Sequence, residues 1–228
     1  MTKQQADDAV VATGLRGHRT LDPKRSATRR REILRAAARV FAERGYYACT
    51  VEDIARAIGV SKGVIYYYFR SKDEICTEVV SAAIEGAIQR LEAVVAMGGT
   101  SAEMLRRAVA VHVEYNINDQ EEGYYAMLVV HDVKALSPQS IRKVRELQRA
   151  YGRAFASIVR RGIEDGSLLD RDIGVTTLTI LTSANYVTDW FRPGGSLRVD
   201  EVANHVADQL LDGVLKQPTS ASAQAISD

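Results

Sequence analysis

The residues with the most distinctive chemistry in this sequence lie between positions 61 and 72. Lys62 is followed, one helical turn later, by three consecutive tyrosines, Tyr66, Tyr67 and Tyr68. Ammonium and phenol groups can donate hydrogen bonds to phosphates and base edges, and Gly63 allows a close approach of the backbone. Because three consecutive residues of a helix cannot all face one core, at least one tyrosine is exposed. The pattern favours contact with DNA; the alternative is that the tyrosines only pack a small helical domain.

Two short helices joined by a tight turn are expected to position these groups. Thr50 precedes an apolar-periodic segment and has Asp53 three residues later, which predicts a capping box at the start of the first helix. Gly59 suits the turn, and the Ser61 hydroxyl is expected to cap the second helix.

Apolar residues of the second helix and polar residues just after it predict how this helix is attached and where it ends. Ile65 and Phe69 lie four residues apart and are expected to attach it to the domain. Ser71 and Glu74 predict a second capping box, so another helix begins at once. A helix, a short turn and a second helix with exposed polar groups form the plan of a helix-turn-helix DNA-binding unit.

The segment from about Ala27 to Val80 resembles the DNA-binding domain of TetR-type transcriptional regulators. The resemblance rests on Thr50, Ile54, Ala55, Gly59, Val60, Ser61, the run Ile65–Phe69, and Lys72. It implies that Lys62, Gly63, Val64 and Tyr67 face base edges. It also implies contacts to the DNA from Thr50, Ser61, Tyr66, Tyr68 and Lys72, mostly to the backbone. Tyr68 stands where the family most often has His, and both side chains can hydrogen-bond a phosphate.

The formal net charge of +1 conceals a strong asymmetry along the chain. Residues 16–72 hold 14 Lys and Arg against 5 Asp and Glu, a net charge of +9. Residues 73–228 hold 15 against 22, a net charge of −7. A basic front segment on an acidic body is typical of a nucleic-acid-binding unit attached to a second domain, although charge alone does not identify DNA.

The composition argues against several other classes of protein. Prolines number only four and helix-favouring residues are plentiful, which predicts an all-α fold. No apolar run is long enough to span a bilayer and no secretory signal is apparent, so we expect a cytoplasmic protein. The sequence has no metal-ligand spacing and no catalytic constellation, so no metal, cofactor or enzymatic activity is expected. Cys49 and Cys76 are expected to be reduced, partly buried thiols.

The periodicity divides the chain into four segments. They are a flexible, basic-ended tail (1–27), the helix-turn-helix domain (28–72), a helical ligand-binding and dimerisation domain (73–216) and a disordered tail (217–228). The basic end of the first tail is expected to touch phosphates or the minor groove. The first helix is expected over 28–44, with Gly45 as its stop. Later helices are predicted at about 72–95, 101–118, 121–135, 138–165, 173–191 and 199–216.

The helix over 173–191 carries little charge. Only Asp189 interrupts its apolar residues, so the helix is expected to be buried nearly all round. The final helix adds a second apolar face, made by Val202, Val206, Leu210, Val214 and Leu215. Two helices from each of two subunits would form a four-helix interface, and the dimers of TetR-type regulators are similar.

The central helices carry polar groups on otherwise apolar faces, as the walls of small-molecule sites do. The candidate ligand-binding residues are Tyr115, Tyr124, Tyr125, His131, Tyr151, Phe155, Asn185 and Tyr186, and Asn116 is a further polar group on these faces. Each can equally be a satisfied core or interface residue, so the pocket rests mainly on the resemblance. The run Asp189–Gly195 resembles the subgroup of TetR-type repressors that control fatty-acid or steroid breakdown and respond to acyl-CoA thioesters.

We therefore expect a homodimeric regulator that binds a palindromic operator with two recognition helices about 34–36 Å apart. By the resemblance, it is a repressor that a small-molecule ligand, an acyl-CoA thioester, releases from DNA. The alternatives are a ligand-responsive activator and an architectural protein that binds DNA without a sequence preference.

Overall fold

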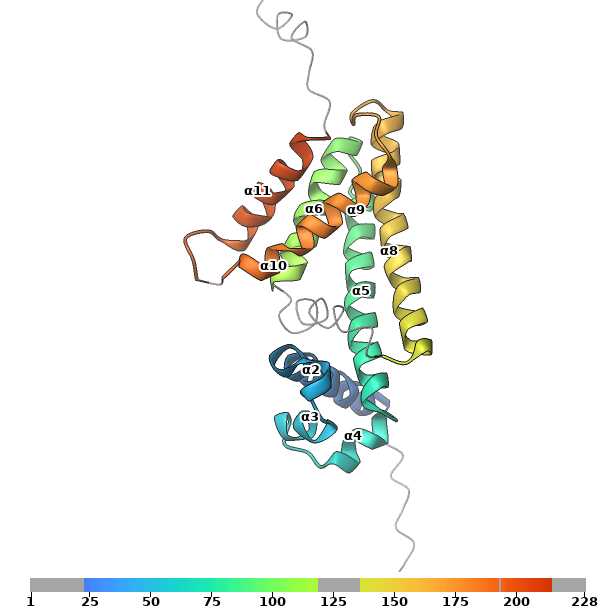
Figure 1. Ribbon diagram of the computed structural model, residues 1–228, viewed down its shortest axis with the longest axis vertical. Helices are drawn as coiled ribbons and strands as arrows, with labels where there is room; N and C mark the ends of the chain where they lie inside the picture. Colours follow the sequence, from blue (N-terminus) through green and yellow to red (C-terminus); the bar gives the residue numbers. More distant parts are fainter. Residues whose placement is uncertain (1–22, 119–135, 193, 215–228) are drawn as a thin grey trace, which may run out of the picture. The chain divides into compact units, whose positions relative to one another are not determined.

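A computed structural model of the chain describes residues 23–118, 136–192 and 194–214. The helices in these ranges (Figure 1) are α2 (Pro23–Ala48), α3 (Val51–Ala57), α4 (Lys62–Tyr68), α5 (Lys72–Ala96), α6 (Ser101–Asn118), α8 (Pro138–Glu164), α9 (Ile173–Asn185), α10 (Val187–Trp190) and α11 (Val199–Asp212). The predicted all-α fold is confirmed. None of the described helices is long and apolar enough to cross a membrane. The predicted helix at 121–135, with Tyr124, Tyr125 and His131, lies outside the described residues, as do most of both predicted tails.

Helix α2 differs from the prediction at both ends. It begins at Pro23 instead of Thr28, because a proline at the first helical position has a suitable φ and no N–H to satisfy. The first helix therefore starts inside the segment that was predicted to be a tail. Gly45 is a kink, with φ 74° and ψ 160°, and the chain returns to helix and continues to Ala48. The amide of Cys49 donates to the Gly45 carbonyl at 3.2 Å, which closes this last turn.

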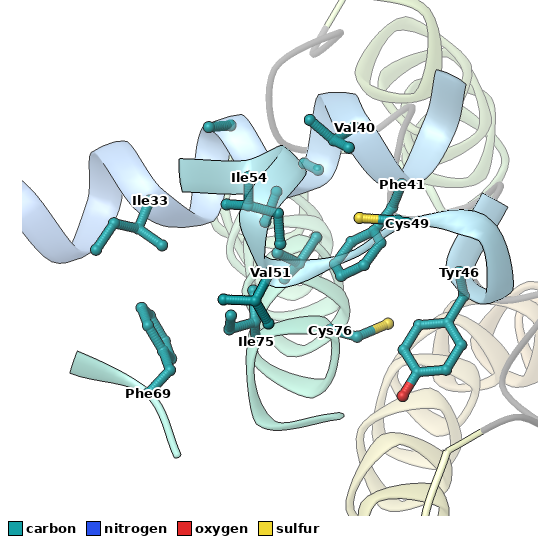
Figure 2. Close-up of a cluster of buried hydrophobic side chains, with 14 of the residues drawn as sticks. Ile33, Val40, Phe41, Tyr46, Cys49, Val51, Ile54, Phe69, Ile75 and Cys76 are labelled. Carbon is teal, nitrogen blue, oxygen red and sulfur yellow. The ribbon is translucent and has the colours of Figure 1, made fainter. Parts of the chain in front are cut away.

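The buried apolar side chains form two separate clusters. The N-terminal core joins α2, α3, α4, the first half of α5 and the start of α8, and Figure 2 shows part of it. Its largest buried members are Ile33, Phe41, Ile54, Ile65, Phe69 and Ile75. Cys49 and Cys76 are free thiols buried in this core. The C-terminal core joins the end of α5 with α6, the second half of α8, α9, α10 and α11.

Helices α5 and α8 contribute to both cores. They pack against each other along their length and run side by side in Figure 1. Each is long enough for this role, with 25 residues in α5 and 27 in α8. A movement of either helix therefore changes the packing of both cores.

The predicted helix over 173–191 is two helices separated at Tyr186. The Tyr186 amide is shared between the carbonyls of Thr182 and Ser183, at 3.2 Å each, and the Thr188 hydroxyl donates to the Asn185 carbonyl at 3.1 Å. The bond to Thr182 is the regular helical one, and the bond to Ser183 spans only three residues, as does the bond of 3.1 Å from the Asp189 amide to the Tyr186 carbonyl. The helix is tightened at this point, and the short helix α10 follows from Val187.

Helix α11 also ends earlier than predicted, at Asp212 instead of about Lys216. Past this end, the Val214 carbonyl accepts a hydrogen bond from the Leu169 amide at 2.8 Å. The chain is thus tied to the loop that follows α8, and it leaves the helix at Gly213.

Candidate nucleic-acid interface and ligand cavity

The predicted capping box at the start of α3 is confirmed. The Asp53 amide donates to the Thr50 hydroxyl oxygen at 3.2 Å, and the Thr50 amide donates to the Asp53 carboxylate at 3.0 Å. The Thr50 hydroxyl also donates to this carboxylate, at 2.6 Å. The hydrogen bonds that the Thr50 hydroxyl and amide donate hold the pKa of Asp53 below its ordinary value. Arg44 and Arg56 also pair with this carboxylate, at 2.9 and 3.1 Å. The Thr50 hydroxyl is therefore already used inside the domain.

The turn between α3 and α4 depends on Gly59. Its φ of +67° lies in the left-handed region, which favours glycine. The Val60 amide donates to the Ala55 carbonyl at 3.0 Å and the Gly59 amide to the Arg56 carbonyl at 3.2 Å, which is the Schellman pattern. This turn fixes the direction in which α4 leaves the domain.

Helix α4 is held by its apolar side and exposes its tyrosines. Ile65 and Phe69 are 0% and 1% exposed, so the predicted anchors are buried. Tyr66 and Tyr67 are 47% and 68% exposed, whereas Tyr68 is half-buried against the N-terminal core. The alternative in which all three tyrosines pack inside the domain is therefore wrong.

The predicted cap by the Ser61 hydroxyl is wrong. Ser61 has the extended backbone of an N-cap residue, but its side chain makes no capping hydrogen bond. The first turn of this short helix is closed instead by the Val64 amide, which donates to the Ser61 carbonyl at 2.9 Å. The exposed hydroxyl and the nearby Gly63 are therefore available at the same end of α4.

The Lys62 ammonium group lies on the exposed side of α4. It pairs with the Glu52 carboxylate of α3 and lies 5.6 Å from the centre of the Tyr66 ring. The hydrogen bond to Glu52 raises the pKa of Lys62, so this group stays charged. Both side chains of the pair are about half exposed, and DNA can compete with Glu52 for the ammonium group.

Lys72 lies differently, because its ammonium group points back into the domain. It donates to the carbonyls of Tyr46 and Cys49 at 2.7 and 2.8 Å, and it lies 4.3 Å from the centre of the Tyr46 ring. These carbonyls follow the Gly45 kink, so Lys72 closes the end of α2. Its predicted contact to a DNA phosphate must be made in addition to this structural role.

The second predicted capping box, at the start of α5, is present only in part. The Glu74 amide donates to the Ser71 hydroxyl oxygen at 3.1 Å, as expected. The Glu74 carboxylate, however, accepts from the amide of Arg70 instead of Ser71, at 2.6 Å. The extended backbone of Ser71 brings the earlier amide within reach.

Asp73 joins the start of α5 to the start of α8. Its carboxylate accepts hydrogen bonds from the Ser137 amide, the Ser137 hydroxyl and the Ser140 hydroxyl, at 2.7, 3.1 and 2.5 Å. Lys72 and Asp73 are neighbours, so the last turn of α2 and the first turn of α8 are fixed to the same point of α5. No feature of the sequence alone indicated this junction.

A cavity of about 230 Å³ lies between α5, α6, α8 and α9. It is lined by Val80, Ala83, Ile84, Ala87, His112, Tyr115, Asn116, Gln148, Tyr151, Leu178, Leu181, Thr182 and Asn185. The walls are mainly apolar, with a few convergent polar groups, which is the usual character of a small-molecule site. None of these lining residues is Asp, Glu, Lys or Arg.

Three of the predicted ligand-binding residues line this cavity: Tyr115, Tyr151 and Asn185. Phe155 is fully buried behind Tyr151, with ring centres 6.3 Å apart, and is part of the C-terminal core. Tyr186 is 65% exposed and does not line the cavity. Its position does not support the predicted role, because successive residues of a helix point about 100° apart and Asn185 is the one that lines the cavity.

His112 is the main residue that sequence reasoning missed. It is buried and lies one turn before Asn116 on α6, so the spacing of four residues was the available signal. Its partners Tyr151 and Asn185 are 39 and 73 residues further along the chain, and nothing local indicates them.

Helices α9 and α10 expose an apolar stripe. Val175, Leu178, Tyr186 and Trp190 recur at helical spacing and are between 55% and 66% exposed. The expectation that this segment is buried nearly all round is therefore not met within one chain. Val202 of α11, predicted to face a partner, is instead buried in the chain's own C-terminal core.

The exposed α4 on a Schellman turn, anchored by Ile65 and Phe69, defines a helix-turn-helix DNA-binding protein with a separate helical body. Residues 33–79 match the family "Bacterial regulatory proteins, tetR family", and residues 98–214 match "Tetracyclin repressor-like, C-terminal domain". The chain belongs to the TetR family. It is a DNA-binding transcriptional regulator and not an enzyme.

Named relatives match over most of the chain. The HTH-type transcriptional repressor KstR2 of Rhodococcus jostii is 29% identical over 94% of this chain and 98% of its own length. The TetR-family regulator PfmR of Thermus thermophilus superposes with a TM-score of 0.71 at 32% identity, over 79% of this chain and 97% of that one. The ketosteroid regulator KstR2 of Mycobacterium tuberculosis has a TM-score of 0.74 at 26% identity, over 83% and 96%.

Proposed function

We propose that this protein is a homodimeric repressor that a small apolar ligand releases from a palindromic operator. The observation that carries the proposal is the path of α5. Its first residues, Lys72 and Asp73, hold the end of α2 and the start of α8. Two to four turns later, Val80, Ala83 and Ala87 of the same helix line the cavity. A ligand in the cavity therefore acts on the helix that carries the DNA-binding unit.

The DNA contacts come from the exposed side of α4. Lys62 donates to guanine O6 or N7 in the major groove, and Tyr67 and Gly63 lie beside it. Tyr66 contacts the DNA backbone. Two copies of α4 in successive major grooves require half-sites about one helical turn apart. Such a protein works in the compartment that holds the chromosome.

The dimer forms through the exposed stripe of α9 and α10. A contiguous apolar surface of this kind is unusual on a protein that stays monomeric. Val206 and Leu210 of α11 are only partly buried in their own chain and add to the interface, whereas Val202 does not. A two-fold axis through α9 and α11 gives the four-helix interface.

The effector is an acyl-CoA thioester or a related thioester of a steroid fragment. The relatives named KstR2 support a ligand from steroid metabolism, since one of them is described as a ketosteroid regulator. The run from Asp189 to Gly195 supports the same subgroup. The cavity of about 230 Å³ suits the acyl part of such a ligand, because a complete thioester is larger than the space enclosed by the described residues.

Release follows from differential binding. A ligand that prefers the arrangement of α5 and α8 in which the two copies of α4 have the wrong spacing lowers the affinity for DNA. By thermodynamic linkage, operator DNA lowers the affinity for the ligand by the same factor. Asp73 transmits the change, because its carboxylate connects both helices near the DNA-binding unit.

The test measures both affinities on the dimer. Anisotropy of a labelled operator duplex is followed with and without octanoyl-CoA, and ligand binding is measured by calorimetry with and without the operator. We expect equal coupling factors from the two measurements. Asp73→Asn is expected to keep both separate affinities and to reduce the coupling, whereas the control Asp170→Asn, on an exposed loop, leaves it unchanged. Operator affinity that no thioester of medium or long chain alters would contradict the proposed release.

A further inference from the structure

Four polar side chains meet on one side of the cavity, and their hydrogen bonds fix which groups face a ligand. The His112 Nε2 atom lies 2.7 Å from the Asn185 side-chain oxygen, and the His112 Nδ1 atom lies 2.8 Å from the Tyr151 hydroxyl. The Asn116 side-chain nitrogen lies 3.1 Å from the same Asn185 oxygen and 3.2 Å from His112 Nε2. It donates to the oxygen, since a protonated Nε2 cannot accept. These contacts connect α6, α8 and α9 through one group of side chains.

The Asn185 oxygen can only accept, so the histidine carries its proton on Nε2. Its Nδ1 atom then accepts from the Tyr151 hydroxyl, and the two rings stack with centres 5.6 Å apart. This arrangement occupies the oxygen of the Asn185 amide. The amide nitrogen of Asn185 has no hydrogen-bond partner among the residues that the structure describes, and it belongs to a residue that lines the cavity. It is a donor available to a ligand.

None of the described residues that line the cavity is charged at pH 7. Burial lowers the pKa of His112 from 6.5 to about 4, and burial raises the pKa of Tyr151 above its ordinary value. The other polar lining groups are amides and hydroxyls, which do not ionise in this range. A carboxylate moved into such a wall loses its hydration and gains no countercharge, which costs far more than moving a neutral carbonyl.

We propose that this cavity binds the neutral, hydrogen-bond-accepting end of an apolar ligand, with a carbonyl oxygen on the Asn185 amide nitrogen, and excludes the corresponding free carboxylate. His112, Asn116 and Tyr151 are positioning residues, because they hold the Asn185 amide with its nitrogen toward the ligand. The inference rests on the proposed function only in taking this cavity as the effector site. The regulator then distinguishes an activated or ring-ketone form of its ligand from the free acid.

The experiment compares matched neutral and acidic ligands of the same chain length. Octanamide and octanoate, with the neighbouring chain lengths from butyl to dodecyl, are titrated calorimetrically into the full-length dimer at pH 7 and pH 5. The pKa of an alkanoic acid lies somewhat above the value of about 4.3 for a Glu side chain. If only the uncharged acid enters, octanoate therefore binds roughly a hundredfold more weakly at pH 7 than the neutral acid does. This deficit shrinks to a few-fold at pH 5, while octanamide binds equally at both pH values.

Octanoyl-CoA and a bicyclic ketone are compared to identify the carbonyl group of the ligand. Tighter binding of octanoyl-CoA indicates a thioester, and tighter binding of the bicyclic ketone indicates a ring ketone. Asn185→Leu removes the donor at similar volume, and Ser183→Ala on the exposed side of the same helix is its control. We expect Asn185→Leu to lower the affinity for octanamide at least tenfold and to reduce the difference in affinity between octanamide and octanoate. We expect Ser183→Ala to bind both ligands like the wild type.

Octanoate binding as tightly as octanamide at pH 7 overturns the inference and leaves the repressor function intact. If Asn185→Leu binds octanamide like the wild type, the assigned donor is wrong. Absence of binding by every member of the series, including the thioester and the ketone, overturns the inference together with the effector site. Operator binding, measured separately, still tests the DNA-binding part of the proposed function.

Discussion

His112 gives the stability of the body a defined dependence on pH. Burial lowers its pKa from 6.5 to about 4 in the folded protein. Between these values the unfolded chain binds a proton that the folded protein does not, so stability falls as the pH decreases. From pH 7.5 to pH 5 this one group lowers the free energy of unfolding by about 2 kcal/mol. Among the described residues that line the cavity with it, the other titratable side chains are Tyr115 and Tyr151, and burial raises the pKa of Tyr151 further.

The matched variant is His112→Gln, whose amide can still donate to Asn185 but does not titrate. Urea unfolding is followed by the fluorescence of Trp190, the single tryptophan, at fixed protein concentration because the dimer couples stability to concentration. We expect the variant to be less stable than the wild type at pH 7.5. We expect the stability difference between wild type and variant to shrink by about 2 kcal/mol from pH 7.5 to pH 5.

Taking this difference removes the contributions of all other groups that titrate between pH 5 and 7.5. A difference that is independent of pH means that His112 has an ordinary pKa in the folded protein. The hydrogen-bond assignment around Asn185, and with it the neutral cavity wall, is then wrong.

Three further substitutions separate structural roles from binding roles. Lys72→Met removes two charge-assisted hydrogen bonds at the end of α2, and we expect a loss of about 2–4 kcal/mol in the stability of the N-terminal core, measured by hydrogen exchange. Lys62→Met removes an exposed ion pair, so stability stays unchanged while the selected DNA sequences become less uniform. Val175→Asp places a charge on the α9 stripe, and light scattering is expected to show a monomer.

Each substitution has an outcome that contradicts its interpretation. If Lys72→Met keeps its stability but flattens the salt dependence of DNA binding, Lys72 is a phosphate contact and not a helix-end cap. If Lys62→Met selects DNA sequences that are as uniform as those selected by the wild type, the base contact belongs to another residue of α4. For Val175→Asp, the control is Gln89→Asp on the exposed side of α5, and a dimer in both variants places the interface on another surface.

The DNA-binding unit was predictable from sequence because its signals are local. The capping box of Thr50 and Asp53, the glycine of the turn and the spacing of Ile65 and Phe69 all act within a few residues. Ser61 shows the limit of such signals, since its position in the chain is that of a cap but its hydroxyl makes no capping bond. The choice between two nearly equivalent local bonds depends on a geometry that the sequence does not specify.

The cavity and the junction were not predictable in the same way, because their partners are far apart in the chain. Asp73 binds residues 64 and 67 positions later, and Asn185 reaches a histidine 73 positions earlier. Composition and periodicity predict which helices exist, but not which turns of two helices meet. Tyr186, predicted beside Asn185 in the same site, is exposed because neighbouring residues of a helix point about 100° apart, so only one of the two can line the cavity.

The most direct test of the central claim is selection of bound sequences from a random duplex library by the full-length protein at near-physiological salt. The account predicts a palindrome with half-sites about one helical turn apart, and a selected duplex that octanoyl-CoA or a neutral analogue releases. Retention of duplexes without any shared sequence would contradict it, because α4 would then bind DNA only through its charge.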